Sequence, residues 1–144
     1  MPDVVTAEVR SRMMASIRSK DTKPEIVVRR YLHRHGFRFR LHRKDLAGKP
    51  DLTLPKWSAV VFVHGCFWHK HSGCKYFRLP ATRHEFWSAK IDGNARRDQR
   101  NLEGLLAMGY RVATVWECAL RHREDETLSR LLRFLSSTRT RLEL

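Results

Sequence analysis

The sequence predicts a single α/β domain in which helices cover a central β-sheet. Two apolar runs, residues 58–64 and 110–116, have the composition of buried strands. Residues 82–108, which separate them, have the pattern of helices: a capping box at Thr82 and Glu85 starts the first, and helical character resumes over residues 94–108. Strands joined through a helical crossover usually lie parallel in one sheet, so this order favours a layered α/β fold. A length of 144 residues suits one domain with its own hydrophobic core.

The first segment, residues 6–20, has the pattern of a short helix rich in arginine. Met14 and Ile17 contribute to an apolar edge on this helix. Two interpretations stay open. Either the edge packs against the rest of the domain, or a basic arm lies along DNA and inserts these apolar side chains between bases.

A second helix is expected to begin near Thr22 and to end at Gly36. Thr22 is a common N-cap residue, Pro24 is tolerated in a first turn, and Glu25 stands at the capping-box position. Glu25 is therefore explained by helix capping alone, unless it also belongs to a catalytic site.

Two short strands are expected after this helix. Residues 37–41 alternate apolar and basic side chains, as half-buried strands do. Asp51 opens the next strand, directly after a turn at residues 48–50. Because aspartate is a poor strand former, Asp51 is either a turn-capping residue or a metal ligand at the strand end.

The last predicted element is an amphipathic helix over residues 124–135. We therefore divide the single domain into a basic N-terminal arm that contacts DNA (residues 1–20), a core (residues 21–136) and a C-terminal tail (residues 137–144).

The charge of the chain predicts a polyanionic partner. Lysine and arginine number 29 against 15 acidic residues, a formal net charge of +14. Nucleic acid is the expected partner, because neutralising phosphates releases counterions. No run of 18 apolar residues occurs and the first residues lack the apolar region of a signal peptide, so we expect a cytoplasmic, nucleoid-associated protein without membrane contact.

The stretch His64–Cys74 carries the densest chemistry in the sequence. It holds three histidines, two cysteines and two adjacent aromatic residues directly after a predicted strand. Zinc favours four thiolate or imidazole ligands, and Cys66, His71, Cys74 and Cys118 supply such a set. This set uses every cysteine of the chain. The alternative is three unrelated buried thiols.

Two histidines of this stretch, His64 and His69, have no structural task in that interpretation, although either could replace His71 as a zinc ligand. An imidazole has an unperturbed pKa near working pH, so His69 is a candidate to deprotonate a water or to protonate a leaving oxygen. The strand-end Asp51 is the candidate acidic partner of such a site.

The residues around Asp51 resemble a nuclease motif. Pro50-Asp51 stands eleven positions before Phe62, the layout of the PD-(D/E)-x-K nucleases. Here the usual acid is replaced by Phe62 and the usual lysine by His64. Together with Gly65-Cys66-Phe67-Trp68-His69, this departure closely resembles the very-short-patch repair (Vsr) mismatch endonucleases. Further matches lie at residues 81–87, 111–112 and 115–121.

This resemblance implies a restriction-endonuclease-like fold with a central mixed β-sheet flanked by helices and a structural zinc site. The implied activity is a magnesium-dependent nick in one strand of duplex DNA, 5′ to the thymine of a T·G mismatch. Family members cooperate with mismatch-repair proteins. One copy suffices to nick one strand, so we expect a monomer.

The resemblance also implies roles for individual residues. Asp51 holds magnesium together with the position of Val63, where the family usually has threonine; a contact through the backbone oxygen does not depend on that side chain. His69 is the general acid/base, and His64 and Glu25 assist at the scissile phosphate. The implied zinc ligands are Cys66, His71, Cys74 and Cys118.

The implied contacts to DNA involve aromatic and polar residues. Phe67, Trp68 and Trp87 would wedge into the base stack beside the mismatch, or else pack over the zinc. Lys90 and Asn94 would meet the mismatched bases, or else lie on a solvated helix face. Two rival functions stay open: a zinc-stabilised DNA-binding module without catalysis, and a restriction-type nuclease that cuts matched duplex.

Overall fold

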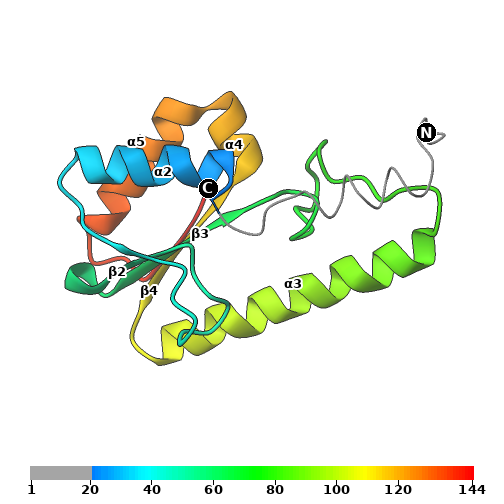
Figure 1. Ribbon diagram of the computed structural model, residues 1–144, viewed down its shortest axis with the longest axis horizontal. Helices are drawn as coiled ribbons and strands as arrows, with labels where there is room; N and C mark the ends of the chain where they lie inside the picture. Colours follow the sequence, from blue (N-terminus) through cyan, green and yellow to red (C-terminus); the bar gives the residue numbers. More distant parts are fainter. Residues whose placement is uncertain (1–20) are drawn as a thin grey trace.

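The computed structural model describes residues 21–144 (Figure 1). The expected helix at residues 6–20, with Met14 and Ile17, lies outside the described residues. Within them, a five-stranded sheet in the order β1-β2-β3-β4-β5 forms the centre of the fold. The strands are β1 (Arg40–Leu41), β2 (Leu52–Leu54), β3 (Ala59–His64), β4 (Arg111–Trp116) and β5 (Arg141–Glu143).

The sheet is mixed, as the sequence predicted. β2 runs antiparallel to both β1 and β3, whereas β3, β4 and β5 run parallel to one another. The β3–β4 pair extends from Ala59 opposite Arg111 to His64 opposite Trp116. The two strands therefore end side by side, and the residues that follow them start from the same edge of the sheet.

Helices cover both faces of this sheet (Figure 1). One face is covered by α2 and α5, and the other by α3, which also runs past the end of the sheet. The helices are α2 (Lys23–Arg34), the 3₁₀ turn η1 (Pro55–Trp57), α3 (His84–Ala107), α4 (Glu117–His122) and α5 (Glu124–Leu135). No helix among residues 21–144 is long and apolar enough to cross a membrane.

The hydrophobic core has two parts, one on each face of the sheet. Val61 of β3 belongs to the larger cluster with the side chains of α2 and α5. Val60 and Phe62 point the other way and pack with Leu105 of α3. β3 is thus covered on both faces, which explains its nearly continuous apolar sequence.

The segment expected to be a C-terminal tail instead contributes to the sheet. Residues 141–143 form β5, which pairs parallel to β4 with Leu142 opposite Ala113. Leu142 is only 5% exposed and joins the larger core cluster. The strand is too short for its alternation to show as a periodic signal, so the sequence pattern did not reveal it.

Both expected capping boxes are wrong. Thr22 stands at the N-cap of α2 but makes no side-chain cap hydrogen bond. Glu25 cannot serve Thr22 in that way because its carboxylate is held by other partners, described below. In α3 the N-cap residue is Arg83, one residue beyond the expected Thr82, and it also lacks a side-chain cap.

The helix after the cysteine-rich loop is continuous, whereas the sequence suggested an interruption before Asn94. Gly93 lies inside α3, where glycine costs about 1 kcal/mol relative to alanine. Contacts on both sides of Gly93 offset this cost. Lys70 pairs with Asp92 at 2.6 Å, and Asn94 Nδ2 donates a hydrogen bond to the Trp68 carbonyl at 3.0 Å.

Arg111, at the start of β4, forms hydrogen bonds that link η1, the end of α5 and the segment before β5. Its guanidinium donates hydrogen bonds to the carbonyls of Trp57, Phe134, Leu135 and Arg139 at 2.9–3.3 Å. These carbonyls belong to η1, the end of α5 and the link to β5. One side chain therefore satisfies the backbone of three segments.

We predict that Arg111→Met destabilises the fold by about 1.5–3 kcal/mol, because charged hydrogen bonds to partly buried carbonyls are lost. Urea unfolding followed by circular dichroism measures the change. Arg130→Met, at an exposed site of α5, is the matched control and should change stability by less than about 0.5 kcal/mol. Equal effects of the two substitutions would contradict the role of Arg111.

Candidate active site and cysteine cluster

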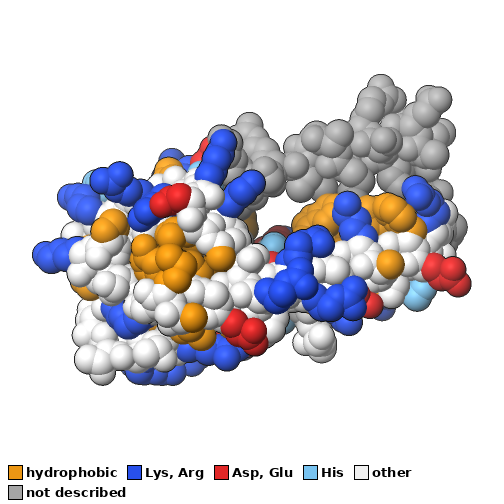
Figure 2. Space-filling model, turned by 90° about the horizontal axis from the view of Figure 1, so that it is seen from below, with side chains coloured by type: hydrophobic (Ala, Val, Ile, Leu, Met, Phe, Trp, Pro, Cys, Tyr) orange, Lys and Arg blue, Asp and Glu red, His pale blue; other side chains and the backbone are white. Residues whose placement is uncertain are grey.

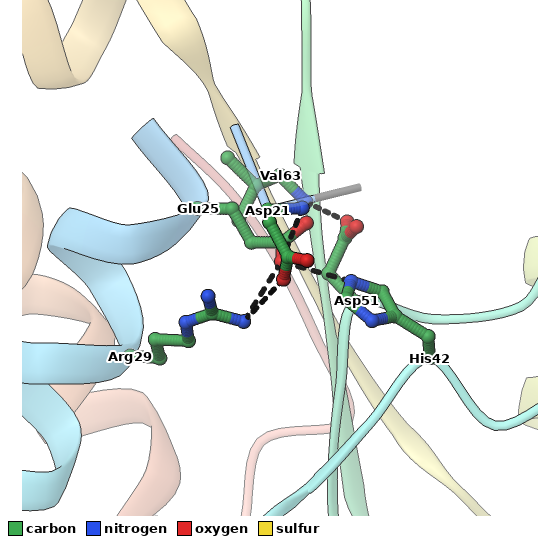
Figure 3. A network of polar contacts seen from close by, with 6 residues as sticks. All are labelled: Asp21, Glu25, Arg29, His42, Asp51 and Val63. Atoms are coloured by element: carbon green, nitrogen blue, oxygen red, sulfur yellow. Dashed lines mark hydrogen bonds and ion pairs between the residues drawn. The ribbon is translucent and has the colours of Figure 1, made fainter. Parts of the chain in front are cut away.

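A group of charged side chains gathers where β2 begins and β3 ends (Figure 3). Asp51 precedes β2, and its Oδ2 accepts a hydrogen bond from the backbone N–H of Val63 at 2.7 Å. Glu25 reaches the same place from α2 and is 1% exposed. Its Oε2 accepts hydrogen bonds from His42 Nε2 at 2.8 Å and from Arg29 Nη1 at 3.2 Å.

The two carboxylates affect each other. Burial raises the pKa of Asp51 to about 8, and the neighbouring Glu25 carboxylate acts in the same direction. The N–H of Val63 acts in the opposite direction but does not outweigh burial. Glu25 has the Arg29 guanidinium as a counter-charge at 3.2 Å. A cation beside Asp51 would therefore relieve an electrostatic cost that is already present in the fold.

The two candidate catalytic histidines stack on each other at the end of β3. The rings of His64 and His69 lie 3.7 Å apart and are parallel within 4°. His69 Nδ1 lies 2.6 Å from the Asp98 carboxylate of α3. An ionised carboxylate accepts a hydrogen bond, so Nδ1 carries the proton and donates it to Asp98, which leaves Nε2 as the other functional nitrogen.

His64 is 8% exposed, and burial lowers its pKa to about 3. The nearby His69 also lowers this pKa, whereas Asp98 raises it. His64 is therefore a neutral imidazole at neutral pH.

The carboxylate group and the histidine group border the same end of β3. Asp51 bonds to the backbone of Val63, and the next residue, His64, carries the stacked His69. Val63 packs with the core cluster on the side of α2 and α5, whereas His64 contacts Phe62 on the side of α3. The two groups thus approach this strand end from its two faces.

The four expected zinc ligands come together beside this site. The ligand atoms of Cys66, His71, Cys74 and Cys118 all lie within 4.8 Å of one another, so these side chains could hold a metal ion. The thiols are free, and Cys118 Sγ lies 3.4 Å from His71 Nδ1. Burial raises the pKa of Cys66 to about 12, so its thiol needs a bound cation to ionise near neutral pH.

The expected DNA-contacting aromatics form one cluster between the loop and α3. Phe67 contacts Trp68 and Trp87 with ring centroids 5.0 and 5.8 Å apart, and the two tryptophans are 5.9 Å apart. All three side chains are half-buried. Figure 2 shows apolar side chains gathered at this end of the molecule, with lysine and arginine around them.

The two expected polar contacts to the mismatch differ in their surroundings. Lys90 is exposed on α3. The Asn94 amide already donates a hydrogen bond to the Trp68 carbonyl, and its oxygen accepts one from Arg97. Asn94 therefore anchors the aromatic loop to α3.

Three residues of the site escaped the sequence analysis: Arg29, His42 and Asp98. Arg29 stands four residues after Glu25 on one helix, a spacing at which opposite charges pair, and that signal could have suggested it. His42 and Asp98 carry no such signal, and only the packing of the fold shows that they meet Glu25 and His69.

Comparisons with known proteins identify the family of this chain. A family model described as "DNA mismatch endonuclease Vsr" matches residues 2–75. The chain belongs to the Vsr family. It is 44% identical to the Escherichia coli "DNA mismatch endonuclease Vsr" over 135 residues, which covers 92% of this chain and 86% of that protein. The chain is therefore similar to a DNA endonuclease along most of its length.

Two further relatives carry nicking-enzyme names. The Xanthomonas oryzae "Type II nicking enzyme V.XorIIP" is 52% identical over 120 residues, 83% of this chain and 88% of that protein. The Neisseria meningitidis "Type II nicking enzyme V.NmeAIP" is 44% identical over 135 residues, 92% of this chain and 96% of that protein. Together with the family match, they identify this Vsr-family chain as a DNA endonuclease.

The raised pKa of Asp51 predicts a pH-dependent stability in magnesium-free buffer. Protonated Asp51 makes its full contribution to the free energy of unfolding below its ordinary pKa of 3.8. This contribution is lost as the pH rises to about 8. Asp51→Asn should therefore stabilise the magnesium-free protein near pH 8 by about 1 kcal/mol or more. Urea unfolding at pH 5 and pH 8 measures this.

Asp45→Asn is the matched control, because Asp45 is exposed and paired with Arg43. It should leave the difference between pH 5 and pH 8 unchanged. If Asp51→Asn is no more stable at pH 8 than the unsubstituted protein, the electrostatic cost assigned to Asp51 is absent.

Proposed function

We propose that this chain is a magnesium-dependent mismatch endonuclease that nicks one strand of duplex DNA 5′ to the thymine of a T·G mismatch. The observation that supports the proposal is that the Asp51 carboxylate and the His69–Asp98 pair both adjoin the end of β3. The net charge of +14 supports a DNA substrate. The name of the E. coli relative supports a mismatch as the target.

The residues beside Asp51 fit a magnesium ion. Mg²⁺ prefers oxygen ligands, and one or two carboxylates with substrate phosphates are its usual environment. Asp51 supplies a carboxylate. The N–H and C=O of one strand residue point to the same side, so the carbonyl of Val63 faces the side on which its N–H meets Asp51. A ligand taken from the backbone makes valine as suitable as threonine at this position.

Bound magnesium would stabilise charge on the scissile phosphate and lower the pKa of a coordinated water. The protein residues then supply orientation and proton transfer. Asp98 holds His69 Nδ1, so His69 Nε2 can accept or donate the proton at the reacting oxygen. Neutral His64 stacks on the ring and limits its rotation. Arg29 and His42 hold the Glu25 carboxylate in place.

The cysteine cluster supports a structural zinc site. Four protein ligands close a tetrahedral site, whereas a catalytic zinc keeps one position open. Cys66, His71 and Cys74 lie on the loop after β3, and Cys118 lies on α4. Zinc held by these residues would fix the loop that carries His69 and the aromatic cluster.

The aromatic cluster supports recognition of a mismatch. Half-buried Phe67, Trp68 and Trp87 form one group of flat rings in a chain of net charge +14. Separating two base steps costs a few kcal/mol, and the cost is lower at a mismatch. An intercalating wedge would therefore select a weakened step. Exposed Lys90 can reach base edges or phosphates, and Asn94 keeps Trp68 in position.

We predict that substitutions in the site abolish most of the nicking activity. His69→Ala and Asp98→Asn should each lower the single-turnover rate by about 10²–10⁴-fold, because general acid–base catalysis is lost or misoriented. Asp51→Asn should remove magnesium-dependent nicking. Asp45→Asn is the control and should nick at the normal rate. Normal nicking by Asp51→Asn or His69→Ala would remove the role assigned to that residue.

A panel of duplexes tests the substrate. The protein with magnesium should nick the thymine strand of a T·G duplex and leave the matched C·G duplex intact. Binding without nicking under the same conditions would favour the DNA-binding module. Cleavage of both strands of the matched duplex would favour the restriction-type nuclease.

Metal analysis tests the cysteine cluster. The purified chain should contain about one zinc per molecule, and Cys118→Ser should lose zinc and lower the melting temperature, because zinc binding is coupled to folding. His84→Ala, at an exposed position of α3, is the control and should keep the metal. A zinc content unchanged by Cys118→Ser would rule out Cys118 as a ligand.

A further inference from the structure

A second group of metal-ligating side chains lies on the α3 side of the sheet. One ligand atom each from His64, His69 and Asp98 lies within 4.8 Å of the others. We propose that these three residues form a binding site for a first-row transition-metal ion such as Zn²⁺, separate from the cysteine cluster and from Asp51. Two imidazoles and one carboxylate on one side of an ion are a known set for such metals.

His64 supplies an independent reason to expect a ligand. Its Nδ1 is buried and has no hydrogen-bond partner among the described residues. The side chain is only 8% exposed. A buried nitrogen without a partner is uncommon in folded proteins, and a bound ion is one of its explanations.

A cavity of about 160 Å³ is lined in part by this side chain. His64, His69 and Asp98 all line it, and β5 contributes Arg141 and Glu143 to its wall. The volume accommodates an ion with water molecules that complete its coordination. Asp98 and Glu143 are acidic residues of the wall, whereas Arg141 is basic, so the acidic lining residues named here outnumber the basic one.

The donor set selects the class of metal. Neutral imidazole binds zinc, iron, cobalt and nickel well, whereas magnesium prefers oxygen ligands and keeps its waters. The two rings are parallel within 4°, so their in-plane lone pairs do not yet converge. His69 is the ring that must tilt, because its side chain is 30% exposed while His64 is buried, and Asp98 can remain its neighbour as a second ligand.

Binding has a consequence that rests on the proposed function. A metal on His69 Nδ1 replaces the hydrogen bond to Asp98 and moves the ring proton to Nε2. His69 then cannot accept a proton at Nε2. The site would therefore make zinc an inhibitor of magnesium-supported nicking, without contact between zinc and the Asp51 carboxylate.

Cobalt binding tests the site without DNA. The full chain is first loaded with one equivalent of zinc to fill the cysteine cluster, and Co²⁺ is then titrated while absorption is recorded. We expect one equivalent of Co²⁺ to bind as the second metal of the chain. Its visible absorption bands should indicate nitrogen and oxygen ligands, with no thiolate-to-cobalt charge transfer. Asp98→Asn and His64→Gln should each weaken this equivalent by about tenfold or more.

Asp92→Asn is the matched control, because Asp92 also lies on α3 but pairs with Lys70. It should leave the second equivalent unchanged. The proposal is overturned if binding stops at one metal per chain, or if the second equivalent survives Asp98→Asn with equal affinity. A folding check by circular dichroism on each variant separates loss of a ligand from loss of structure.

A second arm measures nicking at saturating magnesium with added zinc. Half-inhibition should occur at the zinc concentration that half-fills the second equivalent, and inhibition that does not follow this occupancy would contradict the mechanism of inhibition. Because the cobalt titration contains no DNA, it decides the metal site even if the chain fails to nick a T·G duplex.

Discussion

The parallel pairing of β3 with β4 is the constraint on which the whole site depends. Its register places His64 opposite Trp116 at the last pair. Cys66 and Cys118 each follow this pair by two residues, so the sheet itself brings the distant thiols together. The Trp116 ring contacts both the histidine pair and the cysteine cluster: its centroid lies 5.2 Å from that of His64, and it stacks on His71 at 4.1 Å. A register shift of one residue would separate all of these contacts.

Charge compensation decides the chemistry that this strand end can perform. Glu25 is buried with Arg29 and His42, whereas the Asp51 carboxylate accepts a hydrogen bond from the Val63 N–H and has the negative Glu25 as its neighbour. On the other face, Asp98 orients His69, and burial keeps His64 neutral. The face with Asp51 thus favours a bound cation, and the face with His69 favours proton transfer. Because both groups border the end of one strand, these two properties are complementary for hydrolysis of a phosphodiester.

The sequence predicted the parts of the fold that have long or chemically unusual signals. The β3 and β4 runs, the amphipathic α5 and the four ligands of the cysteine cluster carry such signals, and the structure places them as expected. β5 and α4 escaped because three and six residues are too few to show a period. The first capping box failed because its spacing does not show that Glu25 is buried with other partners, and the second because α3 has its N-cap one residue later, at Arg83.

The site shows the same division between local and long-range information. Asp51, His64 and His69 stand in a local motif, so their types and spacing suggested them. Asp98 and His42 join the site from segments 29 and 17 residues away from their partners, and only tertiary packing selects them among many charged residues. Positioning residues of this kind are difficult to find in a single sequence, because a chain with many charged residues gives no local sign of which ones form specific pairs.

The central claim is that Asp51 and His69 act on the same phosphodiester. A double-mutant cycle of single-turnover nicking on a T·G duplex tests it most directly, with the wild type, Asp51→Asn, His69→Ala and the double variant compared at saturating protein. If the two residues act as a unit, the double variant loses about as much rate as the more damaging single variant. Losses that multiply would show independent effects and would contradict the account.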